Sequence, residues 1–424
     1  MSAQPSNLRR LGMAQRRGAV EQVFAIPPGE WNAISSTPPL LELSDVMVEQ
    51  AIGCMPLPLG VADGFIIDGR ETLIPMAVEE PSVIAAASFA ARLTARDGGF
   101  TTHASQPVMT AQVFLERVSA EGERKLAASE PAVRAALAPR LASLEKRGGG
   151  YRGMSVVRLT VTSTVRVDVK VDVRDAMGAN ILNTAAESLR PLLEAASGGV
   201  SLMAILSNAA LDRTAGASFC IPVGRLTRTL PAGMAAPEAA RRIALASDVA
   251  QEDPTRAVTH NKGIMNGITS LALATMNDAR AVEAAAHAWA SRDGRYRGLS
   301  TFRVEDEALV GELSLPLPLA TVGGAIDLHP AAQACLRILG SPDAERLSRI
   351  AAALGLAQNL AALLALTTYG IQHGHMRMHA ARVAWRAGAR GEEVRRLADA
   401  LSEAGTVDRA AARTLLERLR EGGL

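Results

Sequence analysis

Aromatic side chains are scarce in this sequence, at 3% of 424 residues, which argues against nucleic-acid binding by base stacking. The formal net charge is only +2, so no strong field attracts nucleic acid or an anionic membrane surface. Hydrophobic residues make up 48% of the chain, and the core must be built from Ala, Leu, Val, Ile and Met. We therefore expect a globular protein of two or three domains, with neither a nucleic-acid nor a membrane partner.

Cysteine is also rare. Cys54, Cys220 and Cys335 are scattered and odd in number, so a disulfide framework is not expected and a reducing cytoplasm fits. Residues 1–20 contain arginines but no apolar segment of the kind found in a secretory signal.

The nearest approach to a membrane span is the apolar run 351–368. It has Gln358 and Asn359 at its centre and is only just long enough to cross a bilayer. We expect a buried helix.

The most regular pattern in the chain is the alternation of valine with charged residues from Val165 to Val173. A period of two with β-branched residues indicates a strand with one buried and one solvent-facing surface. Residues 155–162 are a candidate hairpin partner, a helix is expected from about Gly178, and residues 218–223 could return as a strand. Strands with helices on one face predict a small α+β domain.

Alanine-rich helical sequence flanks this stretch, so the small domain is expected to be inserted into a larger one. In the flanking sequence, 81–96 is predicted to be a helix that opens at Pro81. Within the small domain, 130–146 is predicted to be a helix capped by Ser129, with Pro139 as a point where it could bend. The predicted division is an N-terminal arm (1–40), a large domain (41–106 and 220–371), a small domain (107–219) and a C-terminal segment (372–424).

One lysine, Lys262, lies among glycines and amides in the segment 259–267, with no acidic neighbour adjacent in sequence. The glycines allow close backbone approach, and His260, Asn261 and Asn266 supply short polar side chains. An ammonium held among such groups can polarise a carbonyl and stabilise the oxyanion that forms there. The alternative is a surface loop with an incidental lysine.

Several acidic and histidine residues are further candidates for chemistry. If one of the adjacent Glu79 and Glu80 is buried, its raised pKa would suit a proton donor, but both could be solvated at a helix start. Asp278, on local pattern alone, is a helix cap. His375 and His379 have the i, i+4 spacing of a zinc pair, but neither a His-Glu-x-x-His pattern nor a third ligand is evident, so no metal is expected.

Residues 175–180, Asp-Ala-Met-Gly-Ala-Asn, lie where the alternating strand runs into a helix. Free N–H groups at a helix start, surrounded by small residues, can hold a diphosphate. The Gly-x-Gly-x-x-Gly pattern of Rossmann proteins is absent here. An ordinary capped helix start is the alternative.

Four of these motifs, taken together and in this order, resemble hydroxymethylglutaryl-CoA reductase, specifically its soluble bacterial class II form. They are 78–82 (Val-Glu-Glu-Pro-Ser), 172–180, 261–263 (Asn-Lys-Gly) and 374–376 (Gly-His-Met). The resemblance runs from about Leu43 to about Arg390. It implies an α+β protein with a large, helix-rich domain that binds CoA and substrate. It also implies an inserted small ferredoxin-like domain that binds the dinucleotide, and a mobile C-terminal flap from about Gln372.

The resemblance also implies a role for individual residues of this sequence. Those implied in catalysis are Glu80, Lys262, Asp278 and His375. Those implied in dinucleotide binding are Asp175, Met177, Gly178, Ala179, Asn180 and Asn208. Those implied in substrate binding are Ser82, Arg256, Asn266 and Gln358. Lys262 would stabilise the oxyanion beside Asp278, and His375 would protonate the departing CoA thiolate, a task suited to a group that titrates near pH 7.

The implied reaction interconverts mevalonate and 3-hydroxy-3-methylglutaryl-CoA with two nicotinamide equivalents and CoA, in a homodimer or larger homo-oligomer with the active site near the subunit interface. The cofactor is expected to be NAD or NADP with weak discrimination, leaning slightly toward NAD. The family's NAD-preferring members have an aspartate in the helix before the triple glycine, and here its place falls near Leu141 or Ala142. Arg140, Lys146 and Arg147 could instead meet a 2′-phosphate.

A non-catalytic CoA- or nucleotide-binding protein is the rival interpretation. It would be expected to lack at least one of the four catalytic groups, and all four are present.

Overall fold

The structure, a computed structural model, describes residues 11, 13–24, 27, 38–48, 54–370 and 380–421. It is a mixed α+β protein with three antiparallel sheets. The first pairs β1 (Leu59–Ile67) with β2 (Arg70–Ala77). The second has the order β3 (Thr101–Ala104), β8 (Thr214–Pro222), β10 (Ala308–Pro316), β9 (Ser300–Glu305). The third has the order β5 (Gly150–Leu159), β6 (Thr164–Asp172), β4 (Val108–Glu116), β7 (Val200–Ser207).

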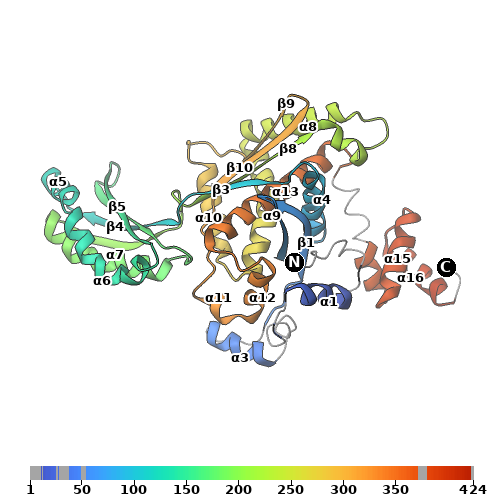
Figure 1. Cartoon of the computed structure of the whole chain (residues 1–424), viewed down its shortest axis with the longest axis horizontal. Coiled ribbons are helices and arrows are strands. Elements are labelled where there is room, and N and C mark those ends of the chain that lie inside the picture. Colours follow the sequence, from blue (N-terminus) through green and yellow to red (C-terminus); the bar gives the residue numbers. More distant parts are fainter. Residues whose placement is uncertain are drawn as a thin grey trace.

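Helices make up most of the remaining described chain. They are α1 (Met13–Phe24), α3 (Pro38–Met47), α4 (Val83–Ala95), α5 (Ala120–Ala128), α6 (Glu130–Glu145), α7 (Ala179–Ser197), the 3₁₀ helix η2 (Val223–Thr229), α8 (Ala236–Glu252), α9 (Pro254–Ala274), α10 (Ala279–Ala290), α11 (Ala325–Leu328), α12 (Pro330–Ile338), α13 (Ala344–Thr367), 380–387, α15 (Glu392–Glu403) and α16 (Arg409–Arg420). In Figure 1 the sheet of β4–β7 with α5, α6 and α7 stands to one side of the main body, and α15 and α16 lie on the opposite side.

The main body is organised around α13, which packs against α4, α8 and α9 and against strands of the second sheet. By length and composition α13 alone, among the helices of the described residues, could cross a membrane, but 78% of its apolar window is buried inside the protein. The expectation of a buried helix at 351–368 is therefore confirmed. The partner of α13 that matters most for the site is α9, which crosses it closely.

The third sheet has the connectivity β-α-β-β-α-β, with its helices on one face and a core of its own. Its central strand β6 confirms the valine pattern, because Val165, Val167 and Val169 are fully buried. The hairpin partner is also confirmed, since β5 pairs with β6 in antiparallel register.

Two details of this region differ from expectation. The polar face of β6 is not fully solvent-facing, because Asp172 is fully buried and pairs with Arg152 at 2.9 Å. The predicted return strand at 218–223 does form, as part of β8, but it pairs with β3 and β10 in the second sheet. The predicted boundary at 219 thus falls inside β8, and the last strand of the small sheet is β7.

Helix starts were predicted less accurately than helices. The helix predicted from Pro81 begins at Val83, with Ser82 as its N-cap in the left-handed region at φ 77°, so the proline precedes the cap. The helix predicted at 130–146 is present as α6, with Pro139 inside it. The hydroxyl of Ser129 accepts no capping hydrogen bond from α6, and it donates to the carbonyl of Leu126 at 2.7 Å.

The two chain ends contact the main body at different places. In the predicted N-terminal arm, Ala19 and Phe24 of α1 pack against a small cluster that includes Leu73 and Ile338. In the C-terminal segment, the helix 380–387 packs with α15 and α16 around a separate apolar core. Arg382 on the first of these helices donates to the carbonyl of Glu79 at 3.2 Å, so this segment reaches the candidate site.

Candidate functional site

Lys262 lies in the middle of a helix, α9, and not in the loop that its glycine-rich surroundings suggested. Residues before the 259–267 segment start the helix. Asp253 accepts a hydrogen bond from the backbone N–H of Thr255 at 2.9 Å, and Pro254 occupies the first turn. An apolar face that includes Ile264 and Ile268 then buries the helix.

The glycine at 267 serves helix packing. A Cβ atom there would lie 3.1 Å from Leu354 Cγ on α13, a tight contact that the leucine would have to shift to relieve, so glycine favours the close approach of α9 and α13. At Gly263 a Cβ atom would meet nothing within 4 Å among the described residues. We had expected the glycines to allow close backbone approach around Lys262. At Gly267 the close approach is between α9 and α13.

Two of the polar neighbours of Lys262 in sequence point away from it. His260 is 1% exposed and its Nε2 lies 2.7 Å from Ser300 Oγ. Asn261 donates to the carbonyl of Arg297 and accepts from the N–H of Leu299, both at 2.8 Å. Burial, assisted by the charge of Arg256, lowers the pKa of His260 to about 4, so this imidazole is neutral at pH 7. The side chains of His260 and Asn261 therefore hold the segment 297–300 in place and do not contact the ammonium of Lys262.

Glu80 forms an ion pair with Lys262, with 3.2 Å between Oε2 and Nζ. The two residues are 182 positions apart in sequence, and Glu80 lies on the short connection between β2 and α4. Their side chains are 61% (Lys262) and 41% (Glu80) exposed, and Glu79 is exposed as well. Neither glutamate is buried, so of the two alternatives the one with two solvated carboxylates before a helix holds. Exposed pairs of this kind stabilise a fold by only ~0–1 kcal/mol. Stability alone therefore gives little reason for the pairing.

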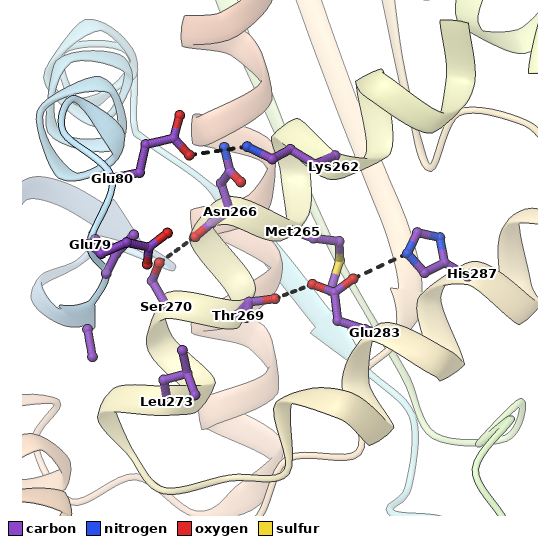
Figure 2. Close-up of a pocket in the computed structure, with 12 residues that line it drawn as sticks. Glu79, Glu80, Lys262, Met265, Asn266, Thr269, Ser270, Leu273, Glu283 and His287 are labelled. Atoms are coloured by element: carbon purple, nitrogen blue, oxygen red, sulfur yellow. Dashed lines mark hydrogen bonds and ion pairs between the residues drawn. The ribbon is translucent and has the colours of Figure 1, made fainter. Parts of the chain in front are cut away.

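The ion pair lies in a pocket of about 260 Å³ between the β2–α4 connection, α9 and α10. Figure 2 shows Lys262 directed toward Glu80, with Asn266 beside them. Glu283 and His287 lie on the opposite side of the view from Glu80. The lining residues are Ala77, Val78, Glu79, Glu80, Lys262, Met265, Asn266, Thr269, Ser270, Leu273, Glu283 and His287. The helix spacing places Lys262, Asn266 and Thr269 on one face of α9.

Among the described residues, Asp278 makes no hydrogen bond or ion pair with Lys262, the group that the resemblance placed beside it. It is the N-cap of α10, accepts hydrogen bonds from the N–H groups of Arg280 and Ala281 at 3.1 Å, and is not among the described residues that line the pocket. Burial raises the pKa of its carboxyl, but the hydrogen bonds from Ala281 and Arg280 and the Arg280 charge outweigh this and lower it below 3.8. Within one chain Asp278 thus acts as a helix cap.

Of the four expected substrate residues, Asn266 lines the pocket, whereas Ser82, Arg256 and Gln358 are not among the described residues that line it. Ser82 caps α4, and its hydroxyl donates to the carbonyl of Pro81. Arg256 is in the first turn of α9 and Gln358 is on α13, packed near Gly267. Arg256 Nη1 and Gln358 Oε1 are buried without a hydrogen-bond partner among the described residues. Both are therefore polar atoms that a ligand could satisfy.

The expected dinucleotide residues from Asp175 to Asn180 lie at the junction of β6 and α7, whereas Asn208 directly follows β7. Gly178 is the N-cap of α7 at φ 91°, and a Cβ atom there would lie 2.6 Å from Val173 Cγ1. Asn180 and Asn208 are exposed, whereas Asp175 accepts a hydrogen bond from the N–H of Ala344 at 3.0 Å. One carboxylate oxygen of Asp175 is thus already engaged at the start of α13. Met177 packs against the core of the main body.

His375 lies outside the described residues, as do His373 and His379, so the position of the expected thiolate acid is not given. Conversely, sequence reasoning missed several polar residues of the pocket, namely Thr269, Ser270, Glu283 and His287. For Glu283 and His287 a signal was available. Their i, i+4 spacing on the helix that follows Asp278 was the available signal.

Comparison with known proteins assigns the family. Residues 12–380 match the family model described as hydroxymethylglutaryl-coenzyme A reductase. The chain is 40% identical over 428 residues to the 3-hydroxy-3-methylglutaryl-coenzyme A reductase of Archaeoglobus fulgidus, with 99% of this chain and 95% of that protein covered. It is 36% identical to a probable reductase of Borreliella burgdorferi, over 78% of this chain and 76% of that protein.

Solved structures of the Streptococcus pneumoniae reductase give the same assignment. One matches with a TM-score of 0.81 at 39% identity, covering 98% of this chain and 99% of that chain. Another, described as the class II enzyme bound to NADPH in open conformations, matches with a TM-score of 0.81 at 40% identity, covering 86% of this chain and 99% of that chain. The chain therefore belongs to the hydroxymethylglutaryl-coenzyme A reductase family, and it is a nicotinamide-dependent oxidoreductase that reduces hydroxymethylglutaryl-CoA to mevalonate.

Proposed function

We propose that the pocket around Lys262 and Glu80 is the active site, and that it carries out two successive hydride transfers, through mevaldyl-CoA and then mevaldehyde. The observation that carries this proposal is the 3.2 Å pairing of Lys262 with Glu80 across 182 positions of sequence. In the first transfer, hydride adds to the thioester carbon and the oxygen becomes an oxyanion. The Lys262 ammonium stabilises that oxyanion. In its protonated form, Glu80 is within reach to deliver a proton to that oxygen and to take the proton back when mevaldyl-CoA collapses.

The collapse of mevaldyl-CoA needs one more acid. As the C–S bond breaks, CoA leaves as a thiolate and the carbonyl of mevaldehyde re-forms. We assign protonation of this thiolate to His375, because of its place in the Gly-His-Met motif. The second hydride then reduces the aldehyde.

The experiment that tests the proposal is turnover of the purified protein with hydroxymethylglutaryl-CoA and either NADPH or NADH, measured as loss of reduced-nicotinamide absorbance. The expected result is oxidation of about two cofactor molecules per mevalonate formed. Binding of CoA without any oxidation of either cofactor would favour the rival interpretation, a non-catalytic CoA- or nucleotide-binding protein.

We propose that the unit of β4–β7 with α5, α6 and α7 is the ferredoxin-like dinucleotide-binding domain, within the predicted range 107–219. Its β-α-β-β-α-β connectivity supports this assignment. The N-terminus of α7, with Gly178, Ala179 and Asn180, offers free N–H groups for the diphosphate. The main body, 41–106 and 220–371, would bind CoA and the substrate.

Enclosure of the aldehyde requires a cover, because the pocket as described is open at the exposed Lys262 and Glu80. We propose that the C-terminal segment 372–424 is that flap and closes over the pocket to exclude water. The hydrogen bond from Arg382 to the carbonyl of Glu79 supports this, since Glu79 itself lines the pocket.

We further propose a homodimer or larger assembly with the active site near the subunit interface. Asp278 does not line the pocket formed by its own chain and its side chain is 37% exposed, so a second copy could bring such a carboxylate to the site. Sedimentation equilibrium at assay concentrations is expected to give at least a dimer. A fully active monomer would contradict the proposal.

We also propose a cytoplasmic location. The free thiols of Cys54, Cys220 and Cys335 are consistent with it.

Cofactor preference should be weak, leaning slightly toward NAD(H), although the solved class II relative was bound to NADPH. Of the two positions considered for the missing aspartate, Leu141 is fully buried in the core of the small unit and cannot face a ligand. Ala142 is half-buried and remains the candidate.

We expect the kcat/KM values for NADH and NADPH to differ by less than roughly 100-fold, which corresponds to about 2.7 kcal/mol. Ala142→Asp should shift the ratio toward NADH, because a carboxylate repels a 2′-phosphate. Ala128→Asp, on the exposed end of α5, is the matched control and should leave the ratio unchanged. Strong NAD(H) selectivity in the unmodified protein would show that another group contacts the ribose.

A further inference from the structure

A second set of polar groups lines the wall of the pocket opposite the Lys262–Glu80 pair. Thr269 Oγ1 donates to Glu283 Oε1 at 2.5 Å, and the other oxygen of Glu283 lies 3.3 Å from His287 Nε2. The remaining ring nitrogen of His287 lies 2.7 Å from the hydroxyl of Tyr296, whose ring stacks on the imidazole at 5.9 Å. These contacts form a hydrogen-bond chain, Thr269–Glu283–His287–Tyr296, and Figure 2 shows its part from Thr269 to His287.

The hydrogen-bond chain determines whether the Thr269 hydroxyl can donate or accept a hydrogen bond with a ligand. A hydroxyl has one proton to donate and two lone pairs to accept with. The proton of Thr269 is committed to Glu283, and both carboxylate oxygens of Glu283 are in turn occupied. Because Thr269 also lines the pocket, its free lone pair is the part available to a bound molecule. At this point the pocket can therefore accept a hydrogen bond but cannot donate one.

The position on α9 fits a ligand that is also held by Lys262. Thr269 is seven residues, or about two turns and ~10 Å along the helix axis, beyond Lys262 on the same face. Asn266 lies between them and lines the pocket as well. A molecule with a carbonyl near Lys262 and a hydrogen-bond donor further along its length would span these groups.

We propose that Thr269 is a specificity-determining residue, whose oxygen accepts a hydrogen bond from a hydroxyl or amide donor of a bound reactant, and that Glu283 and His287 are positioning residues that hold it in this orientation. The inference rests on the proposed function of this pocket. Two reactants supply such a donor: hydroxymethylglutaryl-CoA, through its 3-hydroxyl or an amide of its CoA arm, and the nicotinamide cofactor, through its carboxamide.

Replacement of Thr269 distinguishes these sources. Thr269→Val removes the oxygen at nearly constant shape and should raise the KM of one reactant roughly 3- to 10-fold, as expected for one neutral hydrogen bond. A raised KM for hydroxymethylglutaryl-CoA assigns the donor to the substrate, and a raised KM for the nicotinamide assigns it to the cofactor. Thr269→Ser should restore the value. Thr229→Val, in η2 and not among the residues that line the pocket, is the matched control, because its hydroxyl donates to the carbonyl of Leu226 within the same short helix.

Glu283→Gln tests the positioning role. A glutamine can donate to Thr269 and so turn its hydroxyl proton toward the pocket, and the same KM should rise. Because both changes disturb one contact, the double variant Thr269→Val/Glu283→Gln should be no worse than the poorer single variant. The proposal would be overturned if the effects of the two changes on KM were additive. It would also be overturned if both single variants lost melting temperature equally with unchanged KM values, because the hydrogen bonds would then only join α9 to α10.

Failure of the proposed function is distinguishable from this outcome. If Lys262→Ala leaves turnover intact, the pocket is not the active site and both proposals fall. An enzyme that depends on Lys262 but whose two KM values are unchanged in Thr269→Val overturns only the assignment of Thr269.

Discussion

Lys262→Ala is expected to lower turnover of hydroxymethylglutaryl-CoA by at least about 100- to 1,000-fold while leaving the fold intact. Loss of one neutral oxyanion donor already costs that much, and here a full positive charge is removed from beside the developing oxyanion. Stability should change little, because the side chain is 61% exposed and the ion pair that it forms with Glu80 is also exposed. The measurements are steady-state turnover with saturating reduced nicotinamide, and thermal unfolding.

A surface lysine provides the matched control. Lys125 pairs with Glu121 at 2.8 Å on α5 and is likewise 61% exposed, so Lys125→Ala removes a similar ion pair far from the pocket. Its turnover should equal that of the unmodified protein. Near-normal turnover of the Lys262 variant would rule out the mechanism proposed for this pocket.

His375→Gln is expected to slow cleavage of the thioester by roughly 100- to 10,000-fold, the usual contribution of a positioned general acid. Reduction of added mevaldehyde should be far less affected, because only the first half-reaction expels a thiolate. The two half-reactions are assayed separately, the first with hydroxymethylglutaryl-CoA and the second with mevaldehyde, both followed by loss of reduced nicotinamide.

His379→Gln is the comparison variant, four positions further along the sequence. It should leave both half-reactions largely intact, since the proposed proton transfer uses only His375. Equal losses in the two half-reactions of the His375 variant would mean that this histidine has a positional role. Equal, metal-dependent losses in both histidine variants would instead revive the zinc-pair alternative.

Local pattern was a good guide where burial alone decides structure. The valines of β6 alternate with charges because one face of that strand must be dry, and the dry face could be predicted without knowing its neighbours. The apolar run around Gln358 and Asn359 was similarly predictable as a buried helix, since its length and polar centre suit a core better than a bilayer. Strand pairing was harder: β8 was expected near the small sheet, but its register is with β3 and β10.

The sequence by itself determined the family, the identity of the candidate catalytic groups and the core faces of the main elements, because these depend on residue type and spacing. Only the tertiary structure decided which groups meet. It placed Lys262 on a helix, because the packing of Gly267 against α13 and the cap at Asp253 outweigh local glycine content. It also brought Glu80 to Lys262 across 182 positions and left Asp278 as a helix cap. Contacts between distant segments depend on how whole elements pack, and no local spacing encodes that packing.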